Sequence, residues 1–182
     1  MAKKVIVPLA DGFEEIEALT IVDILRRADV DVMLAALETI EVKGAHGVVV
    51  KADALISTID ATQYDMIALP GGLPGATNLA RHEGVQSIIK SFDTQQKHIA
   101  AICAAPYALF TAGVLKNSYT CYPGFHSNIT HDGYKSDDTV VVDSHITTSQ
   151  GPSTAMAFSL SLVEQLCSKE TAQKLASDLL LA

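Results

Sequence analysis

The sequence predicts an α/β sandwich, in which helices cover both faces of a mostly parallel sheet. Strands buried on both faces are typically short and almost wholly apolar. Four runs of this kind occur, at Val5–Ala10, Val30–Leu37, Met66–Pro70 and Ile99–Ile102. Segments with helical periodicity lie between and after these runs, and such alternation predicts βαβ units and therefore a mostly parallel sheet.

Three segments carry the apolar spacing of amphipathic helices. In the first, positions i, i+3, i+4 and i+7 are Val85, Ile88, Ile89 and Phe92. Near the C-terminus the same spacing relates Ala172, Leu175, Ala176, Leu179 and Leu180. A further helix is expected after the Gly151-Pro152 pair, and its apolar face is formed by Ala155, Phe158, Leu162 and Leu166.

The remaining segments complete one domain. Residues Thr39 to Lys51 favour a small hairpin, and Tyr119–Ser149 has patchy β character with several turns. No internal repeat, low-complexity tract or linker divides the 182 residues, a length that suits one domain. We therefore expect a single domain over residues 1–182.

Charge and cysteine content exclude several classes of function. The chain has 13 basic and 21 acidic side chains without a basic block, which argues against nucleic acid or an anionic membrane as partner. The first apolar stretch stops at Asp11, too early for a signal peptide, and no apolar run approaches the about 18 residues of a membrane span. Three cysteines without a C-x-x-C pair fit a reducing compartment rather than a disulfide framework. A cytoplasmic location is expected.

The most informative position is Cys103, which directly follows the apolar run Ile99–Ile102. Pro106 is tolerated only in the first turn of a helix, so the next helix begins close to it and Cys103 lies on the strand-to-helix turn. This helix is expected to include Ala108, Leu109, Ala112 and Leu115. Small residues at Ala101 and Ala105 resemble the spacing of a nucleophile elbow, with cysteine in place of serine. A helix N-terminus stabilises a thiolate, and this context favours a reactive thiol over a small core residue.

The loops at the carboxyl ends of the other strands are expected to complete the site. The backbone N–H of Ala104 is a candidate oxyanion donor, and the Gly71-Gly72 loop can supply a second. Glu14, Glu15 and Glu17 fall in the first turn of the first helix, where acidic residues complement the helix dipole. One of them can reach Cys103 as a protonated carboxyl with a raised pKa, but the spacing does not select which one.

Histidines, glycines and metal-ligating residues add no further chemistry. His126 and His131, near Asp132, lack the defined spacing of a metal site, and His145 is expected to be structural or solvent-facing. The loop of Gly71–Gly75 matches neither dinucleotide-binding nor Walker patterns. We therefore expect no metal and no cofactor.

Four segments together resemble the ThiJ/PfpI superfamily, and more narrowly the branch of the parkinsonism-associated protein and the bacterial YajL chaperone. They are Ala10–Ala18 (ADGFEEIEA), Leu69–Gly72 (LPGG), Ala100–Pro106 (AAICAAP) and Thr148–Pro152 (TSQGP). The resemblance runs in register over essentially the whole chain. It implies a flavodoxin-like sandwich and a homodimer.

The resemblance also implies roles for individual residues. Cys103 would be the nucleophile and redox-sensitive thiol, and Glu17 the protonated carboxyl beside it. The oxyanion N–H groups would come from Gly72 and Ala104. The remaining pocket residues would be Gly71, Tyr122, Gly151 and Pro152.

Three positions depart from the family pattern. Ala104 stands where protease-like relatives have histidine, so the Cys-His pair of a peptidase is missing. Tyr122 stands before Pro123 where the parkinsonism-associated branch commonly has histidine, and a phenol cannot replace imidazole as a base. Ser153 replaces a common glycine, and the sequence does not predict the effect of this change.

The implied function is a cysteine-dependent hydrolase acting on methylglyoxal or glyoxal adducts. It would be a protein deglycase or a glutathione-independent glyoxalase with a role in oxidative stress. Its partners would be small electrophilic carbonyl compounds, glycated proteins and a second copy of the chain. The alternative is a redox-sensing chaperone without turnover, in which Cys103 oxidises to sulfinate. A cysteine peptidase or amidase is disfavoured.

Overall fold

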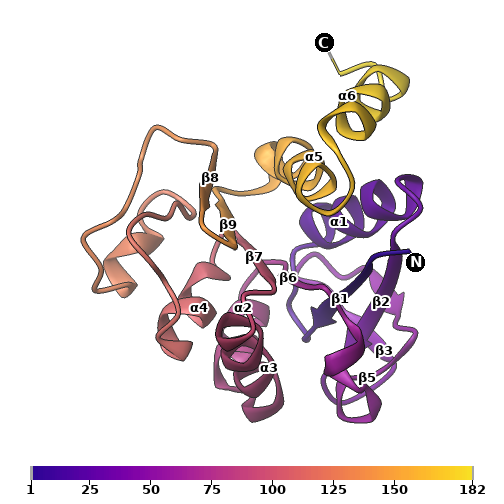
Figure 1. Ribbon diagram of the computed structural model, residues 1–182. Helices are drawn as coiled ribbons and strands as arrows, with labels where there is room; N and C mark the ends of the chain where they lie inside the picture. The colour runs from indigo at the N-terminus through magenta and orange to yellow at the C-terminus, as the bar shows by residue number, and fades with distance from the viewer. Residues whose placement is uncertain (1, 182) are drawn as a thin grey trace.

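The computed structural model describes residues 2–181 and is built on a seven-stranded sheet (Figure 1). In spatial order its strands are β5 (Ala54–Leu55), β2 (Asp31–Ala36), β1 (Lys4–Leu9), β6 (Met66–Leu69), β7 (His98–Ile102), β9 (Ile146–Ser149) and β8 (Val140–Asp143). Only β8 runs antiparallel to its neighbour, and the other five pairings are parallel. The predicted fold class and the four predicted strands are confirmed.

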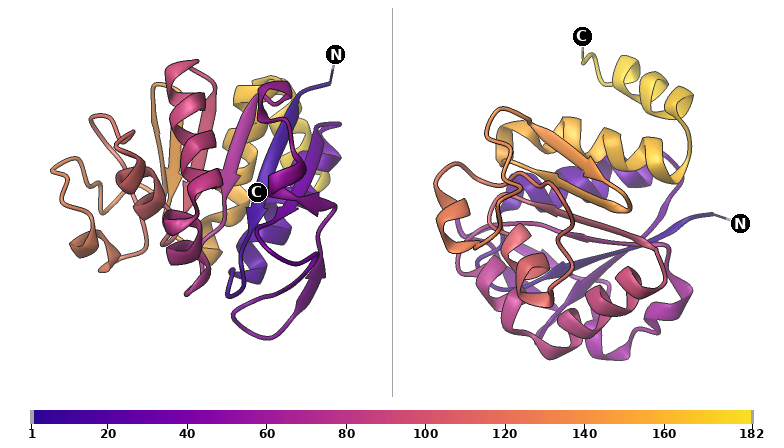
Figure 2. Two further views of the ribbon diagram at one scale, coloured as in Figure 1. Left: turned by 90° about the horizontal axis from the view of Figure 1, so that it is seen from below. Right: turned by 60° about the vertical axis from the view of Figure 1, so that its left-hand side comes forward.

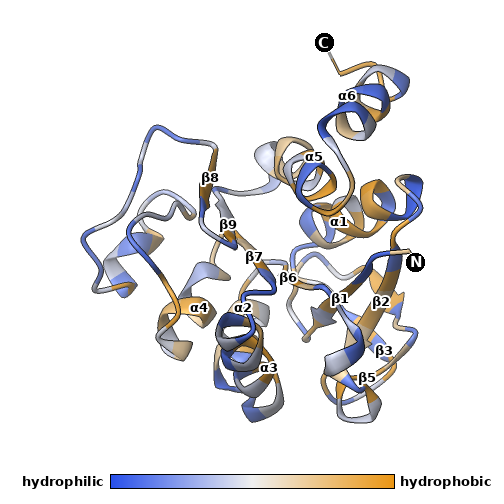
Figure 3. Cartoon of the chain, in the orientation of Figure 1, coloured by the Kyte–Doolittle hydropathy of each residue, from blue (hydrophilic) through white to orange (hydrophobic). Residues whose placement is uncertain are grey.

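Helices cover both faces of this sheet (Figures 1 and 2). On one face lie α1 (Glu15–Arg27) and α5 (Ala155–Leu166), with α6 (Lys169–Asp178) packed on α5. On the other lie α2 (Gly75–Arg81), α3 (Glu83–Thr94) and α4 (Pro106–Ala112). Hydrophobic residues follow the central strands and the helix sides that face them, as Figure 3 shows.

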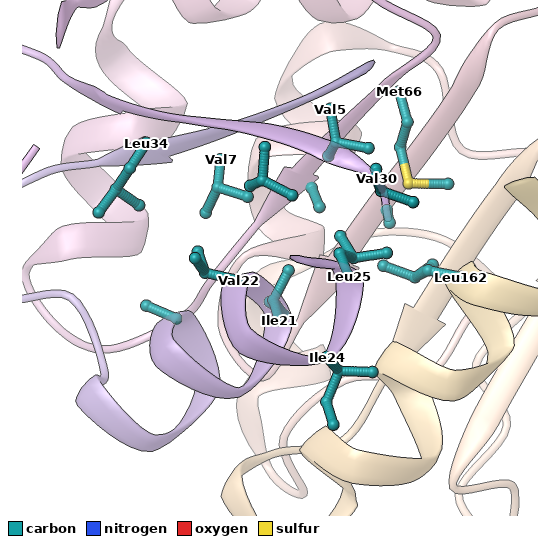
Figure 4. Close-up of a cluster of buried hydrophobic side chains, with 14 of the residues drawn as sticks. Val5, Val7, Ile21, Val22, Ile24, Leu25, Val30, Leu34, Met66 and Leu162 are labelled. Carbon is teal, nitrogen blue, oxygen red and sulfur yellow. The ribbon is translucent and has the colours of Figure 1, made fainter. Parts of the chain in front are cut away.

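The central strands are apolar throughout because both of their faces are buried. Side chains alternate along a strand, so Val5 and Val7 of β1 join the core on the α1 side while Ile6 joins the core on the α3 side. Figure 4 shows the first of these cores, where Val5 and Val7 face Ile21 and Leu25 of α1. This burial on both faces accounts for the uninterrupted apolar runs of the sequence.

Two helices end earlier than the spacing predicted. The helix after Cys103 stops at Ala112 because Gly113 takes a left-handed conformation at its C-terminus, which leaves Leu115 outside. The C-terminal helix stops at Asp178, so Leu180 lies beyond it and is 91% exposed. In both segments the apolar spacing continues beyond the last residue of the helix, so the predicted ends of these two helices were wrong.

Other predicted segments have the expected character. The hairpin is formed by β3 (Glu41–Lys43) and β4 (Val49–Lys51), and β8 with β9 forms the regular part of residues 119–149. Helix α2 was not predicted. Within residues 2–181, every helix is too short or too polar to span a lipid bilayer.

Candidate active site

Hydrogen bonds tie the loops at the carboxyl edge of the sheet into one site. The N–H of Glu14 donates to the carbonyl oxygen of Gly71 at 2.9 Å, which joins the loops after β1 and β6. The N–H of Cys103 donates to the oxygen of Ser149 at 3.0 Å, which joins the loops after β7 and β9. The N–H of Tyr122 donates to the oxygen of Cys103 at 2.9 Å. Five segments that are separate in the sequence therefore meet around the thiol.

Cys103 occupies a strained turn between β7 and α4. Its φ is +64°, a left-handed conformation that costs a non-glycine residue of order 1 kcal/mol or more. Pro106 is the first residue of α4, as predicted, so the turn comprises residues 103–105. The neighbouring Gly71 must lack a side chain, because a Cβ there would stand 2.6 Å from the Cβ of Cys103. The elbow holds a partly exposed thiol at the strand end.

Two backbone N–H groups act on the thiol of Cys103. They belong to Gly72 and Ala104, the two predicted donors, and both act to lower the pKa of the thiol. Gly72 has a φ of +88° and packs against the backbone of residues 12–14, so no other residue fits there without strain. Donors fixed in this way are available to a negative charge that forms near the sulfur.

Glu17 lies beside the thiol and is wholly buried. One carboxyl oxygen, Oε2, accepts a hydrogen bond from the N–H of Gly71 at 2.8 Å, while Oε1 has no partner within the protein. Burial raises the pKa of Glu17 to about 7, and the nearby Glu14 adds to the rise. Hydrogen bonds with Gly71 and Cys103 oppose the rise but do not cancel it. The predicted raised pKa is present, and Glu17 is the glutamate that reaches Cys103.

The thiol itself is not pre-ionised. Burial raises the pKa of Cys103 to about 12, and the charge of Glu17 contributes. The N–H groups of Gly72 and Ala104 act in the opposite direction, as expected at a helix start, but burial outweighs them. Burial therefore opposes the thiolate that the start of the helix was expected to stabilise. Glu17 loses its proton first, and its carboxylate is then placed to accept the proton of the thiol.

The other two glutamates have separate tasks. Glu14 is the N-cap of α1 and accepts a hydrogen bond from the N–H of Glu17 at 2.7 Å. Glu15 holds the tip of the hairpin, where its Oε1 accepts from the N–H of His46 and its Oε2 contacts the ring Nδ1 of His46, both at 2.7 Å. Helix-dipole reasoning explains Glu14, but nothing in the sequence spacing pointed to the contact between Glu15 and the hairpin.

Tyr122 and Gly151 border the site on the side of β9. A Cβ on Gly151 would stand 3.2 Å from Cδ2 of the Tyr122 ring and 4.0 Å from Oε1 of Glu17. Pro152 is half-buried and begins the short helical turn that precedes α5, directly after Gly151. Ser153 is exposed, and nothing in the structure explains its presence in place of glycine.

The other cysteines and histidines lie outside the site around Cys103. Cys121 is buried and Cys167 is exposed. His145 precedes β9 at the opposite edge of the sheet, where its Nε2 contacts Asp93 Oδ1 at 2.8 Å. His126 stacks on the ring of Tyr134. These contacts are structural, in agreement with the expectation for His145.

One group of possible metal ligands occurs within residues 2–181. Ligand atoms of Glu14, Glu15 and His46 lie within 4.8 Å of one another. Glu14 already caps α1, and Glu15 is already paired with His46. Hydrogen bonds within the protein account for these positions without an ion.

Comparison with known proteins shows which family and which relatives the chain is similar to. A family model described as the DJ-1/PfpI family matches residues 3–165. Protein DJ-1 homolog B of Arabidopsis thaliana is 40% identical over 98% of this chain and 42% of its own length. A Caenorhabditis elegans protein named glutathione-independent glyoxalase DJR-1.2 is 34% identical over 98% of this chain and 95% of its own length. The chain thus spans less than half of the Arabidopsis relative and nearly all of the nematode relative.

Similarity extends to solved structures. The structure named Toxoplasma gondii DJ-1, oxidized, superposes with a TM-score of 0.95 at 43% identity, and the match covers 100% of both chains. The seven-stranded sheet with its helices is therefore shared along the full matched length.

Proposed function

The chain belongs to the DJ-1/PfpI family, and we propose that it is a cysteine-dependent enzyme that converts glyoxal and methylglyoxal, free or as adducts, to hydroxy acids. One observation carries the proposal. The thiol of Cys103, the buried carboxyl of Glu17 and two N–H groups converge at the carboxyl edge of the sheet. The name of the nematode relative, a glyoxalase, supports the class of substrate.

The first step is attack of the Cys103 sulfur on the aldehyde carbon. The Glu17 carboxylate accepts the thiol proton as the S–C bond forms, and the C=O electron pair moves onto oxygen. The N–H groups of Gly72 and Ala104, which act to lower the pKa of the thiol, then stabilise this oxyanion. Glu17 returns the proton to the oxygen, and the product is a hemithioacetal.

A proton transfer within the bound substrate then generates the acid. Glu17 removes the hydrogen of the former aldehyde carbon as a proton, which gives an enediolate, and a proton is returned to the neighbouring carbon. The first carbon is oxidised and the second is reduced, so no external oxidant is needed. Water hydrolyses the resulting thioester, which releases lactate or glycolate and restores the thiol.

Adducts enter the same sequence. In an amine or thiol adduct, Cys103 displaces the amine or thiol from the aldehyde-derived carbon, and the leaving group takes the thiol proton through Glu17. The hemithioacetal is the same as before, so deglycation of a protein and conversion of the free aldehyde share one mechanism. Peptidase chemistry is not supported, because Ala104 stands in the place of the required histidine and His145 lies at the other edge of the sheet.

A second function, that of a redox-sensing chaperone, is favoured by the exposure of the same thiol. Cys103 is partly exposed, and peroxide can oxidise it to sulfenate and then to sulfinate, with each peroxide reduced to water. The Gly72 and Ala104 N–H groups are suited to hold the sulfinate oxygens. The relative from Toxoplasma is named as oxidized. Intact mass after mild peroxide tests this function, and a gain of two oxygens on Cys103 is expected.

The partner that we propose for assembly is a second copy of the chain in the cytoplasm. Ile16 and Leu19 on α1 and Val48 and Val49 on the hairpin are exposed apolar side chains close to the Glu15 contact. A patch of this kind supports an interface. All three cysteines are unpaired within the protein, which supports a reducing compartment. Light scattering with purified protein distinguishes dimer from monomer.

The enzymatic proposal is tested by product formation. Purified protein is incubated with methylglyoxal, and with a methylglyoxal-treated peptide, and lactate is quantified. Wild type and Cys121→Ser are expected to form lactate at similar rates, because the side chain of Cys121 packs with Tyr119 and Ile129 in a separate cluster. Cys103→Ser is expected to form none above background. Lactate formation by Cys103→Ser at the wild-type rate would overturn the proposal.

A further inference from the structure

Tyr122 is held against the elbow although its side chain is 51% exposed. Its N–H donates to the carbonyl oxygen of Cys103 at 2.9 Å, and its own carbonyl accepts from the N–H of Phe125 at 2.9 Å. Both polar backbone groups are therefore engaged, which fixes the main chain of Tyr122 beside the elbow, and the ring packs against Gly151.

The ring and the carboxyl of Glu17 border the same small space. A Cβ on Gly151 would stand 3.2 Å and 3.7 Å from two ring carbons of Tyr122, and 4.0 Å from Oε1 of Glu17. Because glycine has no side chain, nothing from residue 151 itself fills this space. The aromatic ring stands over the gap that Gly151 leaves next to the carboxyl.

The environment of Glu17 Oε1 is unusual for an atom in a site that binds substrate. This oxygen is sealed from solvent and has no hydrogen-bond partner in the protein. Buried polar atoms normally have a hydrogen-bond partner, so the groups that close this oxygen off from solvent need to be identified. Gly71 and Cys103 cover other sides of the carboxyl, as the close approaches at Gly71 show.

We propose that Tyr122 is a positioning residue whose ring seals the carboxyl of Glu17 from water across the gap at Gly151. The inference rests on the proposed function in treating Glu17 as the proton carrier for Cys103. It adds a role for the aromatic side chain that the catalytic steps do not use.

Exclusion of water by the ring of Tyr122 has a measurable effect on the protonation of Glu17. The titratable groups that face Glu17 are Glu14 on the same helix and Cys103 on the elbow, with the Gly71 N–H as the third contact. Removing the ring leaves these three groups in place and lets water reach Oε1. Hydration stabilises the carboxylate, so the pKa of Glu17 falls from about 7 toward its ordinary value of 4.5.

The test follows the reactivity of Cys103, which senses the charge of Glu17. Alkylation of Cys103 by iodoacetamide is measured by peptide mass spectrometry between about pH 4 and pH 8 in wild type, Tyr122→Ala and Tyr122→Phe. Wild type and Tyr122→Phe are expected to share one inflection near neutral pH, because both keep the ring. In Tyr122→Ala the inflection is expected to move down by about one pH unit or more. Thermal unfolding confirms that each variant is folded.

Two outcomes would overturn the inference. An unshifted inflection in Tyr122→Ala would show that the ring excludes no water, and an equal shift in Tyr122→Phe would assign the effect to the hydroxyl. If Tyr122→Ala unfolds, Tyr122→Ser and Tyr122→Leu are measured in its place, with a larger shift expected for serine because leucine still fills the gap. Alkylation needs no turnover, so absence of glyoxalase activity would leave this result unaffected.

Discussion

Two buried carboxyls on one helix, Glu15 and Glu17, have opposite chemistry. Glu15 is 7% exposed and Glu17 is 0% exposed, and only one residue separates them in α1. Burial acts to raise the pKa of Glu15, but hydrogen bonds from the side chain and backbone of His46 and from Val48 outweigh it, and the pKa falls below its usual value. Glu17 has one hydrogen bond from Gly71 and an unpartnered oxygen, and its pKa rises to about 7. Depth of burial and the supply of donors together decide whether such a carboxyl is structural or suited to carry protons.

Exchanging each carboxyl for an amide is expected to give the largest contrast in activity. Glu17→Gln removes the proposed base, so kcat/KM for methylglyoxal should fall by roughly 10²-fold or more. Glu15→Gln leaves the elbow intact, and its activity should stay within about threefold of wild type under conditions where it is folded. A larger loss in Glu15→Gln than in Glu17→Gln would reverse the assignment of the two glutamates.

The pH dependence of stability is expected to differ between wild type and Glu17→Gln. The pKa of Glu17 is 4.5 in the unfolded chain and about 7 in the folded one, so between these values the folded chain holds the extra proton. This contribution is therefore present at low pH and is lost as the pH rises toward 7. Across this window, wild type should lose up to about 3 kcal/mol relative to Glu17→Gln. Urea unfolding at several pH values measures the difference, and parallel curves for the two proteins would contradict the raised pKa.

Glu15→Gln is expected to act on stability instead. The amide keeps the size of the side chain but loses the charge that pairs with His46 and accepts from the backbone of the hairpin tip. Loss of these charge-assisted hydrogen bonds should lower the free energy of unfolding at neutral pH by about 2 kcal/mol. Chemical denaturation at pH 7 measures it, and unchanged stability would mean that the hairpin does not depend on Glu15.

His46→Ala is expected to have the smallest effect, because the imidazole is largely exposed. Glu15 raises the pKa of His46 above its ordinary value of 6.5. A raised pKa in the folded state means that the pairing stabilises the protein below pH 6.5, and that this contribution is lost as the pH rises through the folded value. The difference in melting temperature between wild type and His46→Ala should therefore shrink from pH 6 to about pH 9. A constant difference would show that the ring contributes through packing.

The sequence predicted the layers of the fold and the position of the thiol because those features are local. Apolar runs such as Val5–Ala10, and the helix start marked by Pro106, can be recognised from a few neighbouring residues. The roles of Glu14, Glu15 and Glu17 cannot be recognised in this way, because they depend on which loop packs beside α1. Nothing local to Glu15 shows that His46 would reach it.

The reactivity of the thiol illustrates the same limit. A strand end followed by a helix start predicts stabilisation of a thiolate, and the N–H groups of Gly72 and Ala104 are present as expected. How deeply Cys103 is buried, and how close it lies to Glu17, depends on the tertiary packing of four loops. Those two factors reverse the direction of its pKa, and neither can be read from the spacing of residues.

The central claim concerns the carboxyl of Glu17, which lies beside Cys103. This carboxyl is shielded from water and gains or loses its proton near neutral pH. Carbon-13 NMR of protein labelled at the glutamate carboxyl carbons tests it directly, with Glu17→Gln used to assign the resonance. One resonance is expected to titrate with a midpoint near pH 7 and to be missing from Glu17→Gln, while the Glu15 resonance is expected to titrate below 4.5. A Glu17 resonance that titrates at or below 4.5 would contradict the account.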